Sequence, residues 1–501
     1  MDAIGAAADA EADTGEMTST AGPAFLARRR AFAAMERRHA LFDYRAGGWS
    51  PWRVVRGTVQ RLVLEMPQGR IERPTLVRSV EALAATARLL RLFAFARPRR
   101  LLVKSSRAAL RLKQHDRYRD VYFDGLLAEE PSHFKLEDVN SSDFGRQAAA
   151  ALYPGDLNPA AFTFWGRLLG TIFPHRAALP FCRAVASAVQ EQFGVALSPN
   201  WLLLRVSTVA WQARLYEWLL RRLRPAAVLV SDTSEFGLRL ACSRRLIPFV
   251  ELQHGIFDAG HPDAVPADVA GTADELLLPE ALACWGEFWR DQLAGSRQAR
   301  IAVPVGNELV DVARARRARR PGGGPRRLVF TSQDRADQAA TWLMEAVRAA
   351  PDGLDWRLTI KLHPFYEIGA GAFGALVDDP RVQVLGGSVE PNTLDLLTEA
   401  DLHLSISSAC LFDAAALGTR SAVLPLSGHE QILYAADGAA ITVCDDPAQI
   451  WRILAEGRNV PGDGRGFCEP DFVANMKQLV DRLAAPRETG VRAAGKSSES
   501  G

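Results

Sequence analysis

The chain has 501 residues, too many for one hydrophobic core, so its length predicts two domains with extensions. Hydrophobic residues make up 48% and charged residues 24%, as in an ordinary globular protein, and the formal net charge of +2 gives no reason to expect a nucleic-acid partner. None of the six cysteines forms a CxxC pair, which argues against a disulfide or zinc framework. No signal peptide and no run of about 18 apolar residues is visible, so we expect a cytoplasmic protein.

The first 95 residues divide into two parts by composition. Residues 1–21 are rich in Ala, Gly and Thr and are expected to lack order, whereas residues 22–95 carry helical patterns and predict a helical extension. Gly47-Gly48 predicts a turn within it. Four residues here combine interfacial aromatic rings with cations and favour a peripheral contact with an anionic membrane surface at the inner membrane, the alternative being packing against the first domain; they are Trp49, Trp52, Arg53 and Arg56.

Residues 96–306 predict a first Rossmann-like domain on the acceptor side. Short apolar runs that end in small or polar residues are typical of buried strands entering loops. A long and mostly helical stretch covers residues 145–224, and its basic part, with the other arginines of the first 120 residues, favours a local anionic partner or else a solvated face. The predicted strands lie at 99–106, 120–124, 133–139, 226–232, 248–255, near Leu282, and at 301–306.

Residues 307–325 are polar and rich in Gly and Pro, which predicts a linker. From 326 to 486 strands and helices alternate and predict a second Rossmann-like domain, on the nucleotide-donor side, that ends in C-terminal helices; residues 487–501 are expected to lack order. Such alternation implies a parallel sheet covered on both faces. The predicted fold class is therefore α/β, with two Rossmann-like domains, a cleft between them and the helical extension. Ligands bind beyond the carboxyl ends of such strands.

A first polar cluster follows the predicted strand at 248–255. Gly255 permits a tight turn that would expose the imidazole of His254, which could act as a general base or bind phosphate. Glu251 is the rival base and shares a strand face with Gln253. His261 lies just beyond on the same loop, and we place Gln253, Gly255 and His261 on the acceptor side.

A second cluster, Lys361 to Pro364, ends another predicted strand. Pro364 would stop the strand and hold His363 in place, while Lys361 shares the strand face of His363. Both side chains could donate to a nucleotide phosphate. We therefore assign Lys361, His363 and Pro364 to the donor nucleotide.

A third cluster places Ser407 and Ser408 between a strand and a helix. Hydroxyl groups at a helix start can bind phosphate together with free backbone N–H groups, although either serine could equally be a plain cap. The sequence has no GxxxxGK[ST] loop, no metal ligands at recognisable spacing and no DxD element. These absences predict a mechanism without a metal and with no cofactor beyond the nucleotide-activated donor.

These residues carry a resemblance to known families. A strand-end His-Pro followed by a Ser-Ser pair before a helix resembles the second domain of bacterial GT-B glycosyltransferases with CMP-activated donors, such as sialyltransferases, polysialyltransferases and capsule Kdo transferases. It is also similar to the CDP-glycerol glycerophosphotransferases of teichoic acid synthesis. ELQHG, CWGEFWRDQL, LFDYRAGGWSPWR and RYRDVYFDGLL resemble a group of uncharacterised bacterial polysaccharide-biosynthesis proteins. The resemblance spans most of residues 40–460.

The resemblance implies that His363, Pro364, Ser407 and Ser408 lie at the donor phosphates and that the first domain supplies the base. Sialyltransferases have an acidic residue there and glycerophosphotransferases a histidine, and this chain offers Glu251 and His254. The implied function is a metal-independent glycosyltransferase of surface polysaccharide synthesis, with a nucleotide-sugar donor and a saccharide or lipid-linked acceptor. The alternatives are a CDP-polyol phosphotransferase, a non-catalytic GT-B-like scaffold of an assembly complex and, less favoured, a GT-B-type epimerase.

Overall fold

The structure is a computed structural model of the whole chain, and it describes most of the residues between 23 and 485. The predictions of disorder for 1–21 and 487–501, and the role of Pro364, fall outside the described residues. The described ranges are 23–64, 75–105, 110–114, 116–137, 150–231, 234–319, 323–333, 336–363, 370–387, 390–436, 438–457, 460 and 464–485.

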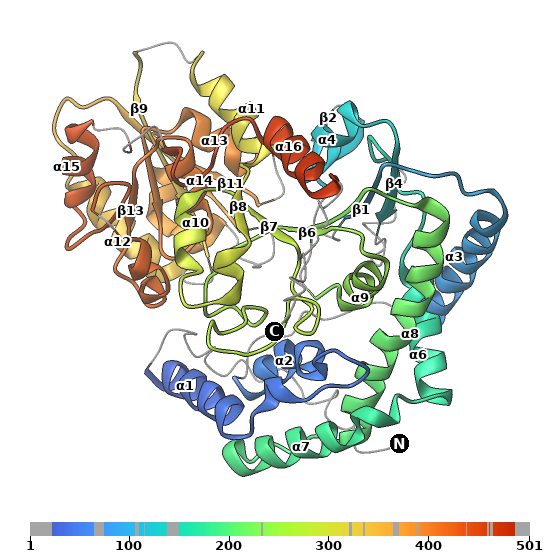
Figure 1. The fold of residues 1–501 in the computed structure, drawn as a ribbon. Coiled ribbons are helices and arrows are strands. Elements are labelled where there is room, and N and C mark those ends of the chain that lie inside the picture. Colours follow the sequence, from blue (N-terminus) through green and yellow to red (C-terminus); the bar gives the residue numbers. More distant parts are fainter. Residues whose placement is uncertain are drawn as a thin grey trace, which may run out of the picture.

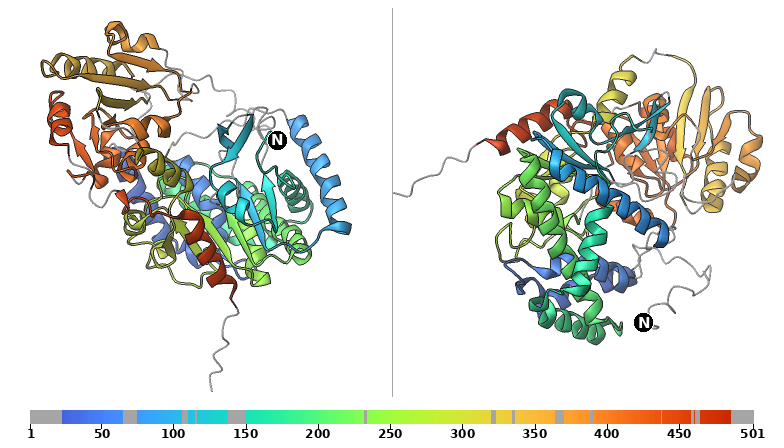
Figure 2. Two further views of the ribbon diagram at one scale, coloured as in Figure 1. Left: turned by 90° about the horizontal axis from the view of Figure 1, so that it is seen from above. Right: turned by 90° about the vertical axis from the view of Figure 1, so that its right-hand side faces the viewer.

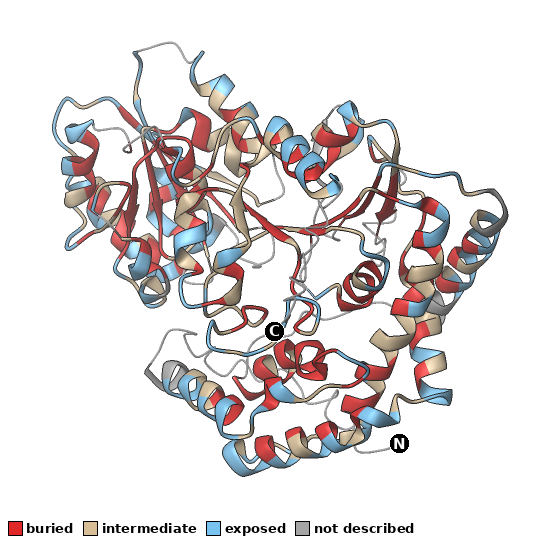
Figure 3. Ribbon diagram, in the orientation of Figure 1, coloured by how far each residue is buried: buried red, intermediate tan, exposed pale blue. Residues whose placement is uncertain are grey.

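The first domain is built on a sheet whose six described strands are all parallel (Figure 1). Most of their side chains are buried, because helices cover both faces (Figure 3). In spatial order the strands are β4 (His133–Glu137), β1 (Leu101–Ser105), β5 (Ala227–Val230), β6 (Phe249–Leu252), β7 (Ala281–Cys284) and β8 (Ala302–Pro304). The helices of this half are α3 (Thr75–Phe95), α4 (Asp124–Glu129), α6 (Ala160–Ile172), α7 (Leu179–Phe193), α8 (Pro199–Leu223), α9 (Phe236–Arg245) and α10 (Glu287–Gln292).

The second domain repeats this architecture with a second parallel sheet of six described strands. The predicted α/β class with two Rossmann-like domains is thus confirmed. In spatial order its strands are β11 (Val382–Leu385), β10 (Trp356–Lys361), β9 (Arg326–Thr331), β12 (Leu402–Ser405), β13 (Ser421–Val423) and β14 (Ile441–Val443). Its helices are α12 (Ala336–Arg348), η4 (Ala370–Asp378), α13 (Thr393–Glu399), α14 (Cys410–Ala416), η5 (His429–Ala435) and α15 (Gln449–Glu456).

The segment predicted as a linker, 307–325, is in part a helix, and this corrects the prediction. The side chain of Asn307 accepts a hydrogen bond from Leu309 N and so caps α11 (Glu308–Arg317). Val310 and Ala313 of α11 are buried against the second domain. Because the segment is rich in basic residues, its short apolar face at helical spacing was not recognised in the sequence.

The C-terminal helix α16 (Phe472–Ala484) returns from the second domain to the first (Figure 2). Its apolar side chains Phe472, Met476 and Leu479 belong to the same core cluster as Leu101 and Leu229 of the first sheet. The chain therefore crosses between the domains twice, at α11 and before α16. Within the described part of the chain, no helix combines the length and apolar character that a membrane crossing needs.

The N-terminal extension packs against the first domain through α1 (Pro23–Arg38) and α2 (Pro51–Val63). The four residues predicted to contact a membrane are all buried: Trp49 and Trp52 are 1% and 0% exposed, and Arg53 and Arg56 are 4% and 6% exposed. That prediction is wrong for these residues. The tryptophan rings fill the core of the extension, and the guanidinium groups donate hydrogen bonds to buried backbone carbonyls of the first domain.

Candidate functional site

The carboxyl ends of the two sheets face each other across the domain boundary. Helix α10 follows the carboxyl end of β7, and α14 follows the carboxyl end of β12. They meet through Phe288, Trp289 and Phe412, whose rings lie 4.7 to 5.6 Å apart. Both Trp289 and Phe412 are buried in one cluster shared by the domains. The loops after the other strands therefore approach one another beside this contact.

His254 lies half-buried directly after β6 on the first-domain side of this boundary. The hydroxyl group of Tyr122 donates a hydrogen bond of 3.2 Å to the backbone carbonyl of His254. Asp258 lies farther along the same loop, and Tyr434 lies on η5 of the second domain. Burial, and then the negative charge of Asp258, raise the pKa of the Tyr434 hydroxyl group. The same loop begins at the domain boundary, because Gln253 accepts a hydrogen bond from the backbone N–H of Trp285, which packs against the cluster shared by the two domains.

His261 lies on the same loop and is close to His254. Burial, and more weakly the neighbouring His254, lower the pKa of His261 to about 4, although Asp263 opposes the shift. At neutral pH the ring is therefore uncharged. Its Nδ1 accepts a hydrogen bond from Asp263 N at 3.1 Å, so the proton is on Nε2. His261 can donate through Nε2 to a hydroxyl group, which leaves His254 as the candidate base of this pair.

Glu251 and Gln253 occupy different surroundings although they were predicted to share a strand face. Glu251 lines a small cavity with Arg53 and Asp263, and it is one of the carboxylates that oppose the lowering of the Arg53 pKa by burial. Gln253 is buried and bonds to Trp285 N and Gly255 O. Strand β6 ends at Leu252, so the alternation of sides ends there too. The negative charge of Glu251 therefore balances part of the Arg53 charge, after the larger contribution of Asp263, and Gln253 joins two loops.

The N-terminal extension holds the backbone of the His261 loop. Arg56 donates to the carbonyls of Pro262 and Ala264 at 2.5 and 2.8 Å, and Arg53 donates to that of Asp263 at 2.9 Å. Glu36 neutralises Arg56 with hydrogen bonds of 2.5 and 3.0 Å. A loop held by this many charge-assisted bonds has a defined position. The extension therefore shapes the first-domain side of the site.

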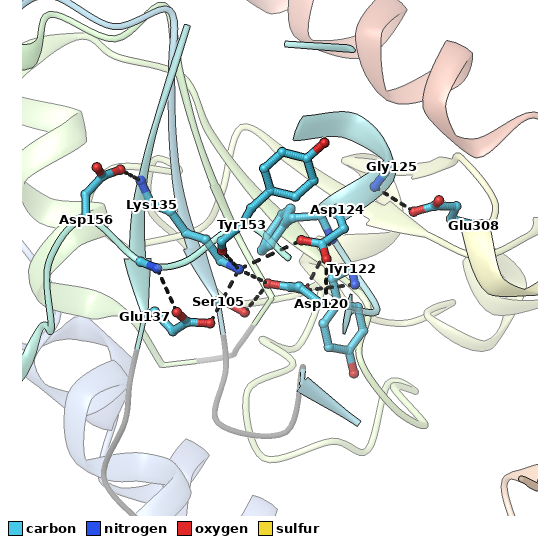
Figure 4. Close-up of polar contacts among 12 residues, drawn as sticks. Ser105, Asp120, Tyr122, Asp124, Gly125, Lys135, Glu137, Tyr153, Asp156 and Glu308 are labelled. Atoms are coloured by element: carbon cyan, nitrogen blue, oxygen red, sulfur yellow. Dashed lines mark hydrogen bonds and ion pairs between the residues drawn. The ribbon is translucent and has the colours of Figure 1, made fainter. Parts of the chain in front are cut away.

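A buried charge cluster lies where β1 and β4 end (Figure 4). The ammonium group of Lys135, fully buried, lies 3.0 Å from Asp120, 3.4 Å from Glu137 and 4.0 Å from Asp124. Burial alone would lower the pKa of Lys135, but the three carboxylates together raise it. Burial, and then Asp120, raise the pKa of Asp124 to about 7. The lysine thus neutralises a site that would otherwise hold three carboxylates.

This cluster also explains why residues 120–124, predicted as a strand, form a turn. Asp120 Oδ1 accepts hydrogen bonds from the backbone N–H groups of Tyr122 and Phe123, which bends the chain. The observed strand is the preceding β3 (Arg117–Asp120), paired antiparallel with β2 (Leu110–Gln114). The turn presents the Tyr122 ring to the loop of His254. The charge cluster is therefore connected to the candidate base through one side chain.

On the second-domain side, the loops that follow β9, β10 and β12 bring polar residues together beside the loop that follows β13. Ser407 donates both its backbone N–H and its hydroxyl group to Gln333 Oε1, at 2.8 and 3.3 Å. His363 N donates to Ser332 Oγ at 3.0 Å. Gly428 lies so close to Ser407 that a side chain there would begin 3.8 Å from the serine hydroxyl. His363 and Ser407 follow β10 and β12, which are separated in the sheet by β9, and Ser332 and Gln333 after β9 connect them. The contact of His363 and Ser407 with a nucleotide phosphate stays a prediction.

Two of the other predicted donor residues have internal partners. Ser408 Oγ accepts a hydrogen bond of 3.2 Å from Cys410 N, the first residue of α14, although the N-cap position of that helix is Ala409. Lys361 is buried and donates to Gly386 O at 2.9 Å; burial lowers its pKa. Their contact with a nucleotide stays a prediction.

His403 lies beneath this site on β12, where its ring nitrogens lie 3.0 Å from the hydroxyl groups of Thr331 and Ser421. Burial lowers its pKa to about 3 from the usual 6.5. The ring is thus neutral in the folded state, whereas the unfolded chain binds a proton below about pH 6.5. This residue therefore contributes stability that is present above pH 6.5 and is lost as the pH falls.

We expect the free energy of unfolding to fall by about 2 kcal/mol between pH 6.5 and pH 5 through His403 alone. His261 acts in the same direction, since its pKa is also lowered. Urea unfolding of the wild type and of His403→Asn at both pH values checks this expectation. The variant should show a smaller loss on acidification, and an equal loss in both proteins would contradict it.

Two facing parallel sheets, joined by α11 and by a C-terminal helix that returns to the first domain, define a two-domain α/β protein of the GT-B-like class. No protein-family model and no curated protein sequence matches the chain.

Similarity appears among solved structures. The chain resembles UDP-GlcNAc 2-epimerase from Methanocaldococcus jannaschii, with 12% identity, a TM-score of 0.45 and coverage of 77% of this chain and 99% of the other. MurG from Acinetobacter baumannii has 12% identity and a TM-score of 0.43, and the match covers 77% of this chain and 100% of MurG. UDP-GlcNAc 2-epimerase from Neisseria meningitidis, bound to UDP-GlcNAc, has 13% identity and a TM-score of 0.40, and the match covers 76% of this chain and 98% of the other. Similarity at this level carries no argument about activity.

Sequence reasoning missed several residues of this site. Ser332 and Gln333 follow an apolar strand in the same way as His363, but a serine or a glutamine after a strand does not by itself indicate a functional site. Their position directly after a predicted strand was the one available signal. Tyr122 was assigned to a strand, so its reach to the His254 loop was not foreseen.

Proposed function

We propose that this chain is a glycosyltransferase that takes a nucleotide-activated sugar as donor and works without a metal ion in bacterial surface polysaccharide synthesis. One observation carries the proposal: donor-type groups gather at the carboxyl ends of β9, β10 and β12 in the second domain, His363 and Ser407 among them, and the loop of His254 begins at the domain boundary, where Gln253 bonds to Trp285. This arrangement gives a phosphate-binding side and a base-bearing side. Both are needed for transfer of a sugar to a hydroxyl group.

In this proposal the nucleotide phosphates lie at Ser407 and His363. The side-chain oxygen of Gln333 accepts a hydrogen bond from the backbone N–H of Ser407, and a phosphate oxygen would replace it as acceptor. His254 removes the proton of the acceptor hydroxyl group, and His261 donates through Nε2 to the acceptor. The departing phosphate is stabilised by donors that are already oriented, which is the largest single contribution in many transferases.

A thermal-shift screen with CMP, CDP, UDP and GDP in EDTA tests the proposal, because a bound ligand stabilises only the folded state. Stabilisation by CMP indicates a Kdo-like or sialic acid donor, and stabilisation by UDP or GDP indicates a common sugar donor. Stabilisation by CDP indicates that the chain is a polyol phosphotransferase. A response only when a divalent metal is added would overturn the metal-free mechanism. No response to any nucleotide would contradict an enzyme of this class and favour the scaffold. Incubation with the matching nucleotide-sugar, analysed for a changed sugar, separates transfer from epimerisation.

We expect His363→Ala to weaken binding of the stabilising nucleotide roughly ten- to hundredfold, through the loss of a charge-assisted hydrogen bond. Ser407→Ala should weaken it less, since the backbone N–H remains. Calorimetric titration of the nucleotide measures both. His133→Ala is the control, because His133 begins β4 at the opposite edge of the first sheet. Unchanged affinity in His363→Ala would remove this residue from the donor site.

A further inference from the structure

Two helices of the first domain, α3 and α6, carry much of the exposed apolar surface. They pack against each other at the outer edge of the domain (Figure 1). The described part of the chain exposes thirteen large apolar side chains, and six of them belong to this pair of helices, each 39–60% exposed. The six are Val80, Leu83 and Leu90 of α3, Leu168 and Ile172 of α6, and Phe173 at the C-cap of α6. Apolar side chains gathered in this way indicate a contact surface.

A hydrogen bond between the helices places several of these side chains on one surface. Trp165 Nε1 of α6 donates to Thr86 Oγ1 of α3 at 2.9 Å. Leu83 and Leu90 lie one turn before and one turn after Thr86, on the same face of α3. Leu168 lies one turn after Trp165, on the same face of α6. The exposed leucines therefore flank the line along which the two helices touch.

The other faces of the two helices are covered by the domain. Ala85 and Leu89 of α3 are buried in a core cluster of the first domain. On α6, Gly166 and Gly170 face α8, because an added Cβ atom would lie 2.7 and 3.0 Å from atoms of that helix. Leu168 lies two residues from each glycine, which on a helix places it on the opposite side. The exposed leucines are thus on the uncovered side of the pair.

The charged groups on this surface are positive. Arg88 and Arg91 of α3 and Arg167 of α6 are exposed, and none of them forms an ion pair with another residue that the structure describes. Glu81 is the one acidic residue in the sequences of the two helices, and it is half-buried. The surface therefore combines aliphatic side chains with positive charge that no carboxylate on the same helices balances at the surface.

This combination fits the surface of an anionic membrane. A bilayer of this kind supplies both complements at once, because acyl chains receive aliphatic side chains and lipid phosphates bind guanidinium groups. A second copy of the chain, paired face to face through the same helices, would bring its own arginines against Arg88, Arg91 and Arg167 without a carboxylate between them. Repulsion between these like charges opposes such a dimer.

We propose that the exposed face of α3 and α6 binds an anionic membrane surface, with its leucines among the acyl chains and its arginines at the lipid phosphates. Helix α3 is the last helix of residues 22–95, the segment in which the sequence predicted a membrane contact at other residues, which are buried. The proposal goes beyond the proposed function and does not depend on it, since lipid binding needs neither donor nor acceptor.

The test is sedimentation of the full chain with vesicles of phosphatidylglycerol and phosphatidylcholine in equal parts, and with vesicles of phosphatidylcholine alone. We expect binding to the mixed vesicles that added salt weakens, and much weaker binding to phosphatidylcholine, because the arginines attract anionic lipid. Arg88→Gln/Arg91→Gln should bind the mixed vesicles at least about tenfold more weakly than the wild type. Arg348→Gln/Arg357→Gln is the matched control and should stay within about twofold, since it removes the same charge from exposed positions of the second domain.

The apolar part of the surface is tested by Leu83→Gln/Leu90→Gln, which keeps the charge and a similar helix propensity. This variant should bind the mixed vesicles at least about tenfold more weakly, because two side chains no longer transfer from water to lipid. Val312→Gln/Val377→Gln replaces two exposed valines of α11 and η4 and should stay within about twofold of the wild type. Thermal unfolding of all four variants should match that of the wild type, since the replaced side chains are on the surface.

Three results would overturn the membrane surface: no binding to the mixed vesicles, binding that both α3 variants leave unchanged, or equal losses in the control variants. Light scattering without lipid tests a second copy as the occupant. A dimer that Leu83→Gln/Leu90→Gln converts to a monomer, together with no vesicle binding, would assign the face to a second copy instead. The nucleotide screen is a separate measurement, so nucleotide binding without vesicle binding rejects this surface and leaves the proposed function in place.

Discussion

The His254→Ala variant is expected to lose about 10²–10⁴ in turnover, the usual cost of removing a general base, while it still binds the donor nucleotide. The reason is the division of roles on the His254 loop: His261 is held neutral with its proton on Nε2, so it can only donate there, and His254 is left to accept. Turnover can be followed without the natural acceptor as slow transfer of the donor sugar to water, and nucleotide affinity by calorimetry.

Glu251→Gln is the paired variant for this experiment. Because Glu251 lines a cavity with Arg53, we expect it to alter stability and to leave turnover per folded molecule within about threefold of the wild type. Loss of turnover in Glu251→Gln alone would transfer the role of base to Glu251. Loss of nucleotide affinity in His254→Ala would make His254 a donor-binding residue instead.

The Lys135→Met variant is expected to lose about 3–5 kcal/mol in the free energy of unfolding, because it leaves buried carboxylates without their cation. Asp120, Asp124 and Glu137 surround the ammonium group, which also donates to Tyr153 O at 3.1 Å. The methionine has a similar volume, so the loss reports charge rather than packing. Urea unfolding at neutral pH measures it, and the deficit should shrink on acidification as the carboxylates become protonated.

Lys477→Met is the control, since Lys477 pairs with Glu129 at 2.9 Å on the surface, where both side chains are about half exposed. Its loss should be much smaller than that of Lys135→Met, because an exposed ion pair is screened by solvent. A Lys135→Met protein as stable as the wild type would contradict the view that this lysine neutralises the cluster. A folded but inactive variant would instead indicate that the cluster acts through Tyr122 on the His254 loop.

The sequence by itself determined the α/β class and the strand ends at which polar groups gather. Buried parallel strands require near-continuous apolar runs, and the runs ending at Lys361 and Ser405 were legible for this reason. His254, His363 and Ser407 follow such runs directly, so their place at the carboxyl edge was predictable from local pattern alone.

The side-chain contacts of the N-terminal extension could not be predicted from the sequence in this way. Trp52 and Arg56 have the composition of a membrane-facing surface, yet the fold buries them against the first domain, where Glu36 and the carbonyls of Pro262 and Ala264 satisfy the arginine. A buried charge is tolerated only with partners, and partners 20 or more residues away are set by packing. Local sequence carries no record of them.

The same difference between local pattern and tertiary packing applies to the two sides of the candidate site. The proposed donor side is made by strand ends of one sheet, where register follows from short-range pattern. The proposed acceptor side depends on the loop of His261, whose backbone carbonyls bond to Arg53 and Arg56 of α2. Helix packing, which depends on the shape of whole surfaces rather than on residue order, decided that side.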